Sequence, residues 1–245
     1  MTSFFVLKYG PPASGKGSKH VKDVIESFGA DIDTYVHFNI DDIVEGERRF
    51  KNNTMALVPT LFGPKNDANK VLNEVTEKNV KPFSNVYLGI KKNLDVKTKI
   101  TKLKNQAVEK RLNITYEMTG SSGWPTWTAD ISRKGYKVKV VFPVVHFEDL
   151  WSRYKKRAIK MYKEGRGFRF GIVKKLGEQD RVYKETLRET YVHSYDNMIA
   201  KLRKGVKPEV HVLIDGISVK VTSRNKNHVI KILKSYVEHA ISYSK

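Results

Sequence analysis

The chain has 245 residues, of which 40% are apolar, 11% aromatic and 29% charged, a composition typical of a folded globular protein. It contains no cysteine, which excludes disulfide scaffolds, thiolate zinc sites and thiol nucleophiles. The longest apolar run near the start, Phe4–Leu7, is too short for a signal-peptide core or for a membrane span of ~20 residues. We therefore expect a cytoplasmic protein with no membrane partner, located in the host cytoplasm or the virion if the source is viral.

The charge of the chain is strongly positive. Lysine and arginine number 46 and acidic residues 26, which gives a formal net charge of +20. Residues 81–111 hold nine basic and two acidic residues, and residues 151–188 hold thirteen and four. Such a field attracts polyanions and favours sequence-independent nucleic-acid binding through counterion release. Solvated faces of lysine-rich helices are the alternative explanation.

The hydrophobic pattern predicts strands that alternate with helices. The first part of the chain is predicted to form a strand at 3–9, a helix at 16–28, a strand at 35–40, and a short helix capped by Asp41 or Asp42 and ending at 50. A loop at 51–65 and a helix at 66–111, interrupted at Pro82, are predicted next, followed by a strand at 113–118, a helix ending at 134 and a strand at 137–145. The last part is predicted to form a basic helix at 148–163, a helix at 172–204, strands at 210–215 and 218–222, and a closing helix at 225–245.

The segment after the first predicted strand fits the phosphate-binding pattern G-x-x-x-x-G-K. It comprises Gly10, Pro11, Pro12, Ala13, Ser14, Gly15, Lys16, Gly17 and Ser18. Between a strand and a helix, such a loop aims backbone N–H groups at phosphate oxygens, and Lys16 reaches the β- and γ-phosphates. Position 17 is a glycine where the pattern normally has the serine or threonine that binds magnesium. Ser18 is then the candidate ligand for Mg²⁺, through water.

The alternation and the loop together predict an α/β fold, with a P-loop NTPase-type parallel sheet and helices on both faces. We expect a single domain over residues 1–245. It would carry a helical insertion at about 50–112, a basic lid helix and loop at 148–171, and a C-terminal helix at 225–245.

Carboxylates follow the second and third predicted strands, at the sheet edge where the phosphate loop also begins. A kinase needs a carboxylate that orients and deprotonates the acceptor hydroxyl, and Asp41 is the candidate, with Asp42 beside it. Glu117 and Thr119, at the end of the third strand, are candidates for binding the acceptor. Trp124 and Trp127 follow them, and indoles near a helix start are more often core anchors than stacking platforms.

Arginines after the fourth strand are candidates for neutralising the transferred phosphoryl group. Arg153 and Arg157 are four residues apart and share one face of the basic helix, while Arg166 and Arg169 lie in a glycine-rich loop. We expect at least one of the four to contact phosphate, with Arg153, Arg157 and Arg166 as the first choices.

Over residues 3–220, outside the insertion, these motifs resemble those of the zeta-toxin-like P-loop kinases and, more distantly, the phage polynucleotide 5′-hydroxyl kinases. The resemblance implies that Asp41, in Asn-x-Asp-x-Ile, is the catalytic base. It implies that Glu117-x-Thr119-Gly120 contacts an acceptor sugar, and that residues 149–157 form an arginine-bearing lid helix. Gly17, the long insertion and the +20 charge depart from the family pattern.

The sequence thus predicts an ATP- and Mg²⁺-dependent kinase that phosphorylates a hydroxyl. The acceptor would be a nucleotide sugar, as the resemblance implies, or a nucleic-acid 5′ end, as the charge implies. The alternative is a non-enzymatic basic protein that binds nucleic acid or is packaged in a virion, and that retains nucleotide binding.

Overall fold

The computed structural model describes residues 2–63, 68–121, 127–171, 180–205 and 207–242. Among these residues, no helix is both long enough and apolar enough to cross a membrane.

The chain divides into two compact units. One comprises Met1–Asn39, Thr101–Leu150 and Thr190–Lys245, and we call it the sheet unit. The other comprises Ile40–Ile100 and Trp151–Glu189, and we call it the helical unit. That residues 1–245 act as a single domain stays a prediction.

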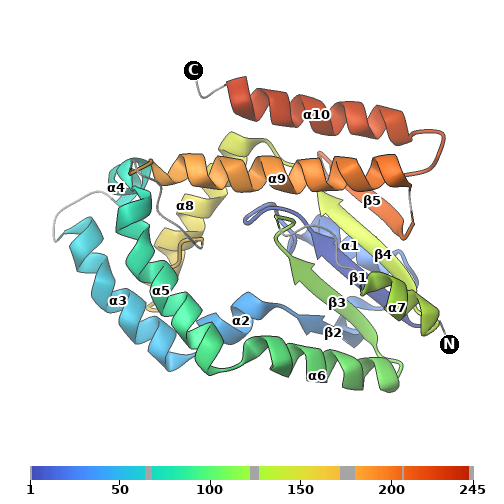
Figure 1. The fold of residues 1–245 in the computed structure, drawn as a ribbon, viewed down its shortest axis with the longest axis horizontal. Helices are drawn as coiled ribbons and strands as arrows, with labels where there is room; N and C mark the ends of the chain where they lie inside the picture. The colour runs from blue at the N-terminus through green and yellow to red at the C-terminus, as the bar shows by residue number, and fades with distance from the viewer. Residues whose placement is uncertain (1, 64–67, 122–126, 172–179, 206, 243–245) are drawn as a thin grey trace. The chain divides into compact units, whose positions relative to one another are not determined.

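The sheet unit is built on a six-stranded sheet with the order β2-β3-β1-β4-β5-β6 (Figure 1). The strands are β1 (Phe4–Tyr9), β2 (Tyr35–Phe38), β3 (Asn113–Met118), β4 (Lys137–Pro143), β5 (Glu209–Ile214) and β6 (Ile217–Lys220). The first five are parallel, and β6 pairs antiparallel with β5. The strand that precedes the phosphate loop is therefore flanked on both sides, by β3 and β4. The predicted α/β class with a mostly parallel sheet is confirmed.

Helices separate most of the strands along the chain. They are α1 (Lys19–Glu26), η1 (Ile32–Thr34), α2 (Ile40–Glu45), α3 (Arg48–Phe62), α4 (Ala68–Glu74), α5 (Glu77–Asn93), α6 (Val96–Glu109), α7 (Thr128–Arg133), α8 (Phe147–Lys163), α9 (Tyr183–Lys204) and α10 (Lys226–Ser242), with η1 a single 3₁₀ turn.

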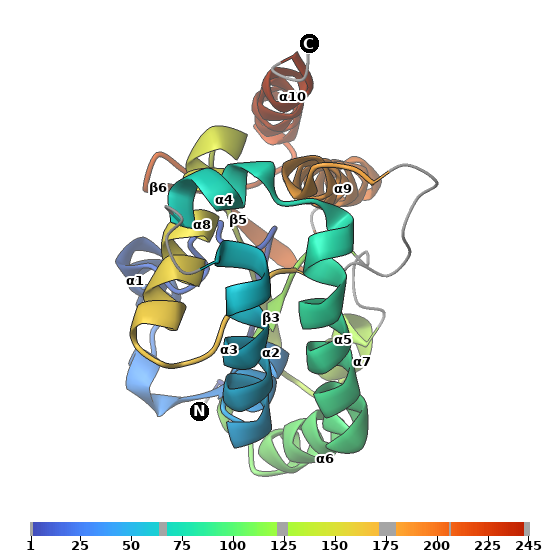
Figure 2. The same ribbon diagram turned by 90° about the vertical axis from the view of Figure 1, so that its left-hand side faces the viewer.

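In the helical unit, α3 and α5 lie side by side (Figure 2). The buried residues of α3 are Phe50, Thr54, Val58 and Phe62, which recur every four residues and therefore share one face. Phe62 packs edge-on against Phe168, which also contacts Phe83 of α5. Aromatic rings thus form much of the core of this unit.

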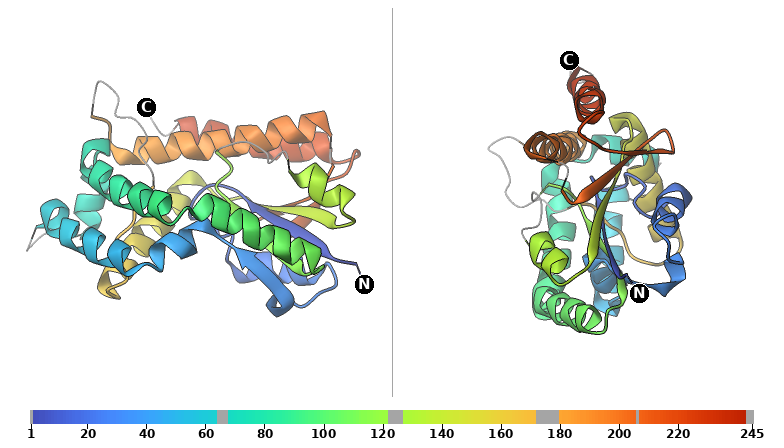
Figure 3. Two further views of the ribbon diagram at one scale, coloured as in Figure 1. Left: turned by 60° about the horizontal axis from the view of Figure 1, so that its bottom comes forward. Right: turned by 90° about the vertical axis from the view of Figure 1, so that its right-hand side faces the viewer.

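Both faces of the sheet are covered, as Figure 3 shows. On one face Phe4 and Val6 of β1 pack with Val21, Val24 and Ile25 of α1. On the other face Phe5 packs with Ile131 of α7 and with the end of α6. Because strand side chains alternate, successive residues of β1 face opposite sides of the sheet, so Phe4–Leu7 are all apolar.

Two predicted breaks are absent. Residues 51–65 were expected to be mostly loop, but α3 continues through Pro59 to Phe62. The buried face of α3 outweighs the missing N–H of this proline, which lies near the end of the helix. Pro82 was expected to interrupt the next helix, and instead lies inside α5. That helix begins after Thr76, whose side chain accepts a hydrogen bond from the N–H of Asn79.

Other boundaries also differ from the prediction. The helix expected at Lys16 begins at Lys19, because Ser18 is its N-cap. Asp41 and Asp42 do not cap α2, and lie inside its first turn. The helix expected from residue 172 begins at Tyr183, and residues 172–179 lie outside the described chain, as does Trp124.

Candidate functional site

The predicted site residues fall into two groups, one in each unit. In the sheet unit, the phosphate loop occupies the turn from the end of β1 to the start of α1. Ser18 ends it, and its hydroxyl accepts a hydrogen bond from the N–H of Val21. Ala13 and Gly15 have φ values of 60° and 90°, in the region where most residues are strained. The sequence therefore forms a tight loop whose N–H groups precede a helix N-terminus.

Lys16 lies across this loop rather than in solvent. Its side chain is buried, and Nζ donates hydrogen bonds of 2.9 Å to the carbonyl oxygens of both Gly10 and Pro11. Nζ is also 3.8 Å from Oε1 of Glu117. In the described part of the chain, the hydroxyl of Ser14 is a buried oxygen with no hydrogen-bond partner. A lysine ammonium and an unpartnered buried hydroxyl in a loop of this shape fit the polyphosphate of ATP.

Glu117 contacts lysines. It is paired in register with Lys8 across β3 and β1, and the Nζ of Lys8 is 3.4 Å from its Oε2. With Lys16 on its other oxygen, Glu117 lies against two cations and is half-buried. Its contact with Lys16 gives it a place beside the phosphate loop. Its predicted role in binding an acceptor stays a prediction.

The turn after β3 is fixed by hydrogen bonds to its backbone. The carbonyl of Gly120 accepts bonds from the Tyr9 hydroxyl (2.7 Å) and from Nδ2 of Asn197 (2.8 Å). The carbonyl of Thr119 accepts one from the Ser194 hydroxyl (2.7 Å), while the Thr119 side chain is exposed and bonds to Ser121. No local sequence pattern indicates these partners, since Ser194 and Asn197 come from α9.

In the helical unit, Asp41 is the centre of a buried cluster. Its Oδ1 accepts a hydrogen bond of 2.6 Å from the Tyr87 hydroxyl and lies 2.8 Å from Nη2 of Arg169. Burial by itself raises the pKa of this carboxyl. The Arg169 charge and the hydrogen bonds from Arg169 and Tyr87 outweigh burial, and they hold the pKa of Asp41 below its usual range. Asp41 is therefore ionised at neutral pH.

Glu45 completes the cluster from the same helix. It lies one turn after Asp41, so the two carboxylates share a face of α2. Its Oε1 contacts Nη1 of Arg169 and is 3.1 Å from Nη2 of Arg157. The Arg169 guanidinium also lies over the Tyr87 ring, 4.9 Å from its centroid. Arg169 thus contacts two carboxylates and an aromatic face at once.

The backbone around Arg169 is held by its neighbours. Phe168 and Phe170 are buried, and the N–H of Phe168 donates a 3.0 Å hydrogen bond to the Thr54 hydroxyl. Gly167 has a φ of 99°, and an added Cβ would lie 2.9 Å from the same hydroxyl oxygen. This close approach requires glycine, and it fixes the direction in which Arg169 leaves the chain.

The remaining predicted residues of this unit do not join the cluster. Arg166 is largely exposed and pairs with Glu164 at 3.3 Å, and Arg153 is exposed on α8. Asp42 is exposed as well, although it lies next to Asp41 in the first turn of α2. Asp41 and Arg169 thus belong to the cluster, whereas Asp42 and Arg166 are exposed, and which of them act in catalysis stays a prediction. Sequence reasoning missed Glu45 and Tyr87; the four-residue spacing from Asp41 is a signal for Glu45, whereas Tyr87 carries none.

The part of Ser18 in binding magnesium stays a prediction. Its hydroxyl caps α1 by accepting a hydrogen bond from the N–H of Val21. Among the described residues there is no group of three or more His, Cys, Asp or Glu side chains that could hold a metal ion. An added Cβ at Gly17 would meet no atom within 4 Å, so space does not explain the glycine there. Any magnesium would take its ligands from phosphate and water.

A parallel sheet with a phosphate loop after a central strand defines a P-loop NTPase-type fold. A chain from the PezAT chromosomal toxin–antitoxin system of the human pathogen Streptococcus pneumoniae has this fold too, with a TM-score of 0.53. The match covers 98% of this chain and 87% of that one, at 13% identity. The predicted likeness to zeta-toxin kinases is thus confirmed for the fold. No model of a known protein family and no curated protein matches this sequence.

Proposed function

We propose that this chain is an ATP-dependent kinase that transfers the γ-phosphate to a hydroxyl group. The observation that carries the proposal is the phosphate loop, with Lys16 buried against the carbonyls of Gly10 and Pro11. On ATP binding, phosphate oxygens would replace these carbonyls as the partners of the ammonium. The exchange costs little because the side chain is already buried and held in place.

Asp41 has the properties that the acceptor step requires. Its carboxylate is ionised at neutral pH, so it can accept a hydrogen bond and then a proton from an acceptor hydroxyl. A depressed pKa makes it a weak base. Phosphoryl transfer through a loose transition state depends more on orienting the hydroxyl than on base strength. Tyr87 and Arg169 hold the carboxylate in one orientation.

We assign charge neutralisation to Arg157 and Arg169, rather than to Arg153 and Arg166. The first two share the Glu45 carboxylate, so their guanidinium groups are close together. Two planar guanidinium groups near one point bind the oxygens of a phosphoryl group better than isolated exposed arginines do. Arg166 instead pairs with Glu164, which also pairs with Lys160, and Arg153 is exposed on α8.

Nucleotide binding is tested by titration calorimetry of ATP against the parent protein and Lys16→Ala. We expect at least about tenfold weaker binding, or ~1.4 kcal/mol, the lower end for a charged hydrogen bond. Lys19→Ala is the matched control, because Lys19 is three residues on and its side chain is 84% exposed. Equal ATP affinity of Lys16→Ala and the parent would remove the kinase proposal.

The acceptor is tested with γ-labelled ATP and a panel of nucleotide sugars and 5′-hydroxyl oligonucleotides. The resemblance of the sequence motifs to those of zeta-toxin kinases favours a nucleotide sugar, and the +20 charge favours an oligonucleotide. Label transferred by the parent and not by Lys16→Ala identifies the acceptor. ATP binding without transfer to either class would instead support the non-enzymatic alternative.

A further inference from the structure

A hollow of about 740 Å³ lies in the sheet unit, at the amino-terminal ends of β4 and β5. The phosphate loop follows the carboxyl end of β1, which is parallel to β4, so the hollow is at the opposite edge of the sheet. It is lined by Thr128, Ala129, Ser132, Tyr136, Lys137, Val138, Lys139, Lys201, Lys207, Pro208 and Glu209. None of these residues belongs to the candidate functional site.

The lining is basic. Four lysines and one carboxylate face the hollow, and the carboxylate of Glu209 is already engaged. It lies 2.8 Å from Nζ of Lys139 and 2.6 Å from Nζ of Lys220. The same carboxylate also lies 2.8 Å from Nε2 of His211, so Glu209 contacts three basic side chains. The other basic residues of the lining are Lys137, Lys201 and Lys207. The three come from separate elements: β4, α9 and the segment before β5.

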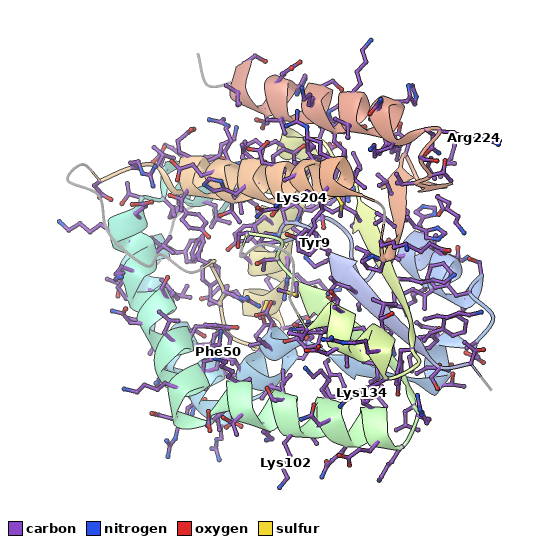
Figure 4. All side chains as sticks on the ribbon, turned by 45° about the vertical axis from the view of Figure 1, so that its right-hand side comes forward. Tyr9, Phe50, Lys102, Lys134, Lys204 and Arg224 are labelled. Atoms are coloured by element: carbon purple, nitrogen blue, oxygen red, sulfur yellow. The ribbon has the colours of Figure 1, made fainter. Side chains whose placement is uncertain are left out.

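The positive charge extends beyond the residues that line the hollow. Residues 128–139 and 201–209, which supply the whole lining, contain eight basic and two acidic residues. The second acidic residue, Asp130, is paired with Arg133. Lys134 and Lys204, labelled in Figure 4, follow α7 and end α9. Burial lowers the pKa of Lys104 on α6; the charge of Lys134 lowers it further, while the charge of Asp130 raises it.

The chemistry of the hollow is that of a phosphate-binding surface and not of a second catalytic centre. Pockets for drug-like ligands are lined predominantly by apolar and aromatic groups, whereas four of the eleven lining residues here are lysines. Lysine binds phosphate as a point charge, without the planar fork by which arginine reads one geometry. Lysines spread over several elements match a polymer with many phosphates, rather than a single phosphate group.

We propose that the hollow, together with the basic residues of 128–139 and 201–209 around it, binds the sugar–phosphate backbone of a nucleic acid. The binding has no sequence preference and is made through Lys137, Lys201 and Lys207. The binding is separate from the proposed kinase activity, since it involves neither the phosphate loop nor the Asp41 cluster. It gives the charge of the chain a defined location, which the total of +20 does not.

The test is fluorescence anisotropy of a labelled 20-nucleotide single strand across a salt series. The variant is the triple Lys137→Gln, Lys201→Gln, Lys207→Gln. Each phosphate neutralised contributes about 0.7 to the slope of log affinity against log salt for a single strand. Loss of three contacts should therefore lower the slope by about 2, which is about 100-fold in affinity at 0.1 M salt.

The matched control is the triple Lys92→Gln, Lys99→Gln, Lys102→Gln, which removes the same three charges from exposed positions of α5 and α6. We expect its slope to stay near that of the parent. Equal losses in both triples would mean that charge acts diffusely, and would overturn the proposal, as would an unchanged slope in the first triple. Urea unfolding of each variant shows that it is folded.

Competition decides the class of ligand. Unlabelled oligonucleotide should displace the labelled strand at much lower phosphate concentration than inorganic phosphate or ATP does. Polyglutamate at the same concentration of charge should displace it poorly. Equal displacement by polyglutamate would assign the hollow to acidic protein segments, and equal displacement by inorganic phosphate would assign it to single anions; either result overturns the nucleic-acid assignment.

Discussion

Replacing Asp41 by asparagine tests the buried cluster independently of any acceptor. The substitution keeps the shape and the Oδ1 acceptor that takes the contacts from Arg169 and Tyr87, but it removes the negative charge and replaces the second oxygen by an NH2 donor. Asp41 accepts one bond from Arg169 and one from Tyr87. A hydrogen bond to a charged group contributes about 1.5–3 kcal/mol and a neutral one about 0.5–1.5, so each bond loses roughly 1 kcal/mol. We expect Asp41→Asn to lower the free energy of unfolding by about 2 kcal/mol.

Asp42→Asn provides the matched control. Asp42 is exposed in the same helical turn, so both variants lose the same interaction of a carboxylate with the start of α2, about 0.3–1 kcal/mol. Any difference between them reports the cluster. Urea unfolding at pH 7 should place Asp41→Asn about 1–2 kcal/mol below Asp42→Asn. In thermal unfolding, that difference is about 2–8 °C for a chain of this size.

Turnover and nucleotide affinity extend the same comparison to the proposed function. With the acceptor identified, Asp41→Asn should lower the transfer rate by about 10²–10⁴-fold and leave ATP affinity unchanged. Asp42→Asn should leave both unchanged. The reasoning is refuted if the two variants unfold alike, because the contacts of Asp41 would then be absent in solution. Full turnover in Asp41→Asn would remove this carboxylate from the mechanism.

Two further substitutions test individual contacts. Tyr87→Phe keeps the ring beside Arg169 but removes the hydroxyl that donates to Asp41, so we expect the pKa of Asp41 to rise. Urea unfolding should show that the free energy of unfolding falls by about 1–2 kcal/mol. Unchanged stability would contradict the hydrogen bond. Despite burial, the hydrogen bonds from Lys139, Lys220 and His211 lower the pKa of Glu209 to about 2. Its ionised form therefore stabilises the fold above the ordinary pKa of 4.5, and this contribution is lost as the pH falls through 2. Glu209→Gln should reduce the free energy of unfolding at pH 7 by up to about 3 kcal/mol. The difference from the parent should shrink between pH 5 and pH 2. A difference that does not change with pH would contradict the lowered pKa of Glu209.

The sheet and the phosphate loop were predictable because their signals are local. β1 begins with four consecutive apolar residues, Phe4–Leu7, and the loop pattern follows the strand directly in the sequence. The helical region at 48–109 was harder, because buried faces outweigh the two prolines inside α3 and α5. A proline signals a break only when packing does not supply the missing stability.

The cluster around Asp41 was predictable only in part. Its contact with Tyr87 joins residues 46 apart in the chain, and no periodicity links them. The local sequence does distinguish Arg169 from Arg166. Arg169 lies between Phe168 and Phe170, and buried neighbours on both sides hold its backbone, whereas Arg166 lies between two glycines.

The sheet ends at both edges in a strand of only four residues, β2 and β6. Short edge strands offer few unpaired backbone groups to another molecule, and Lys220 on β6 adds a charge that discourages close approach. β6 covers β5, whose sequence Glu-Val-His-Val-Leu-Ile is largely apolar and of high β-propensity. A fragment that ends before Ile217 would leave this six-residue strand uncovered. Such a fragment should self-associate at concentrations where the whole chain stays dispersed, because β6 would no longer cover β5.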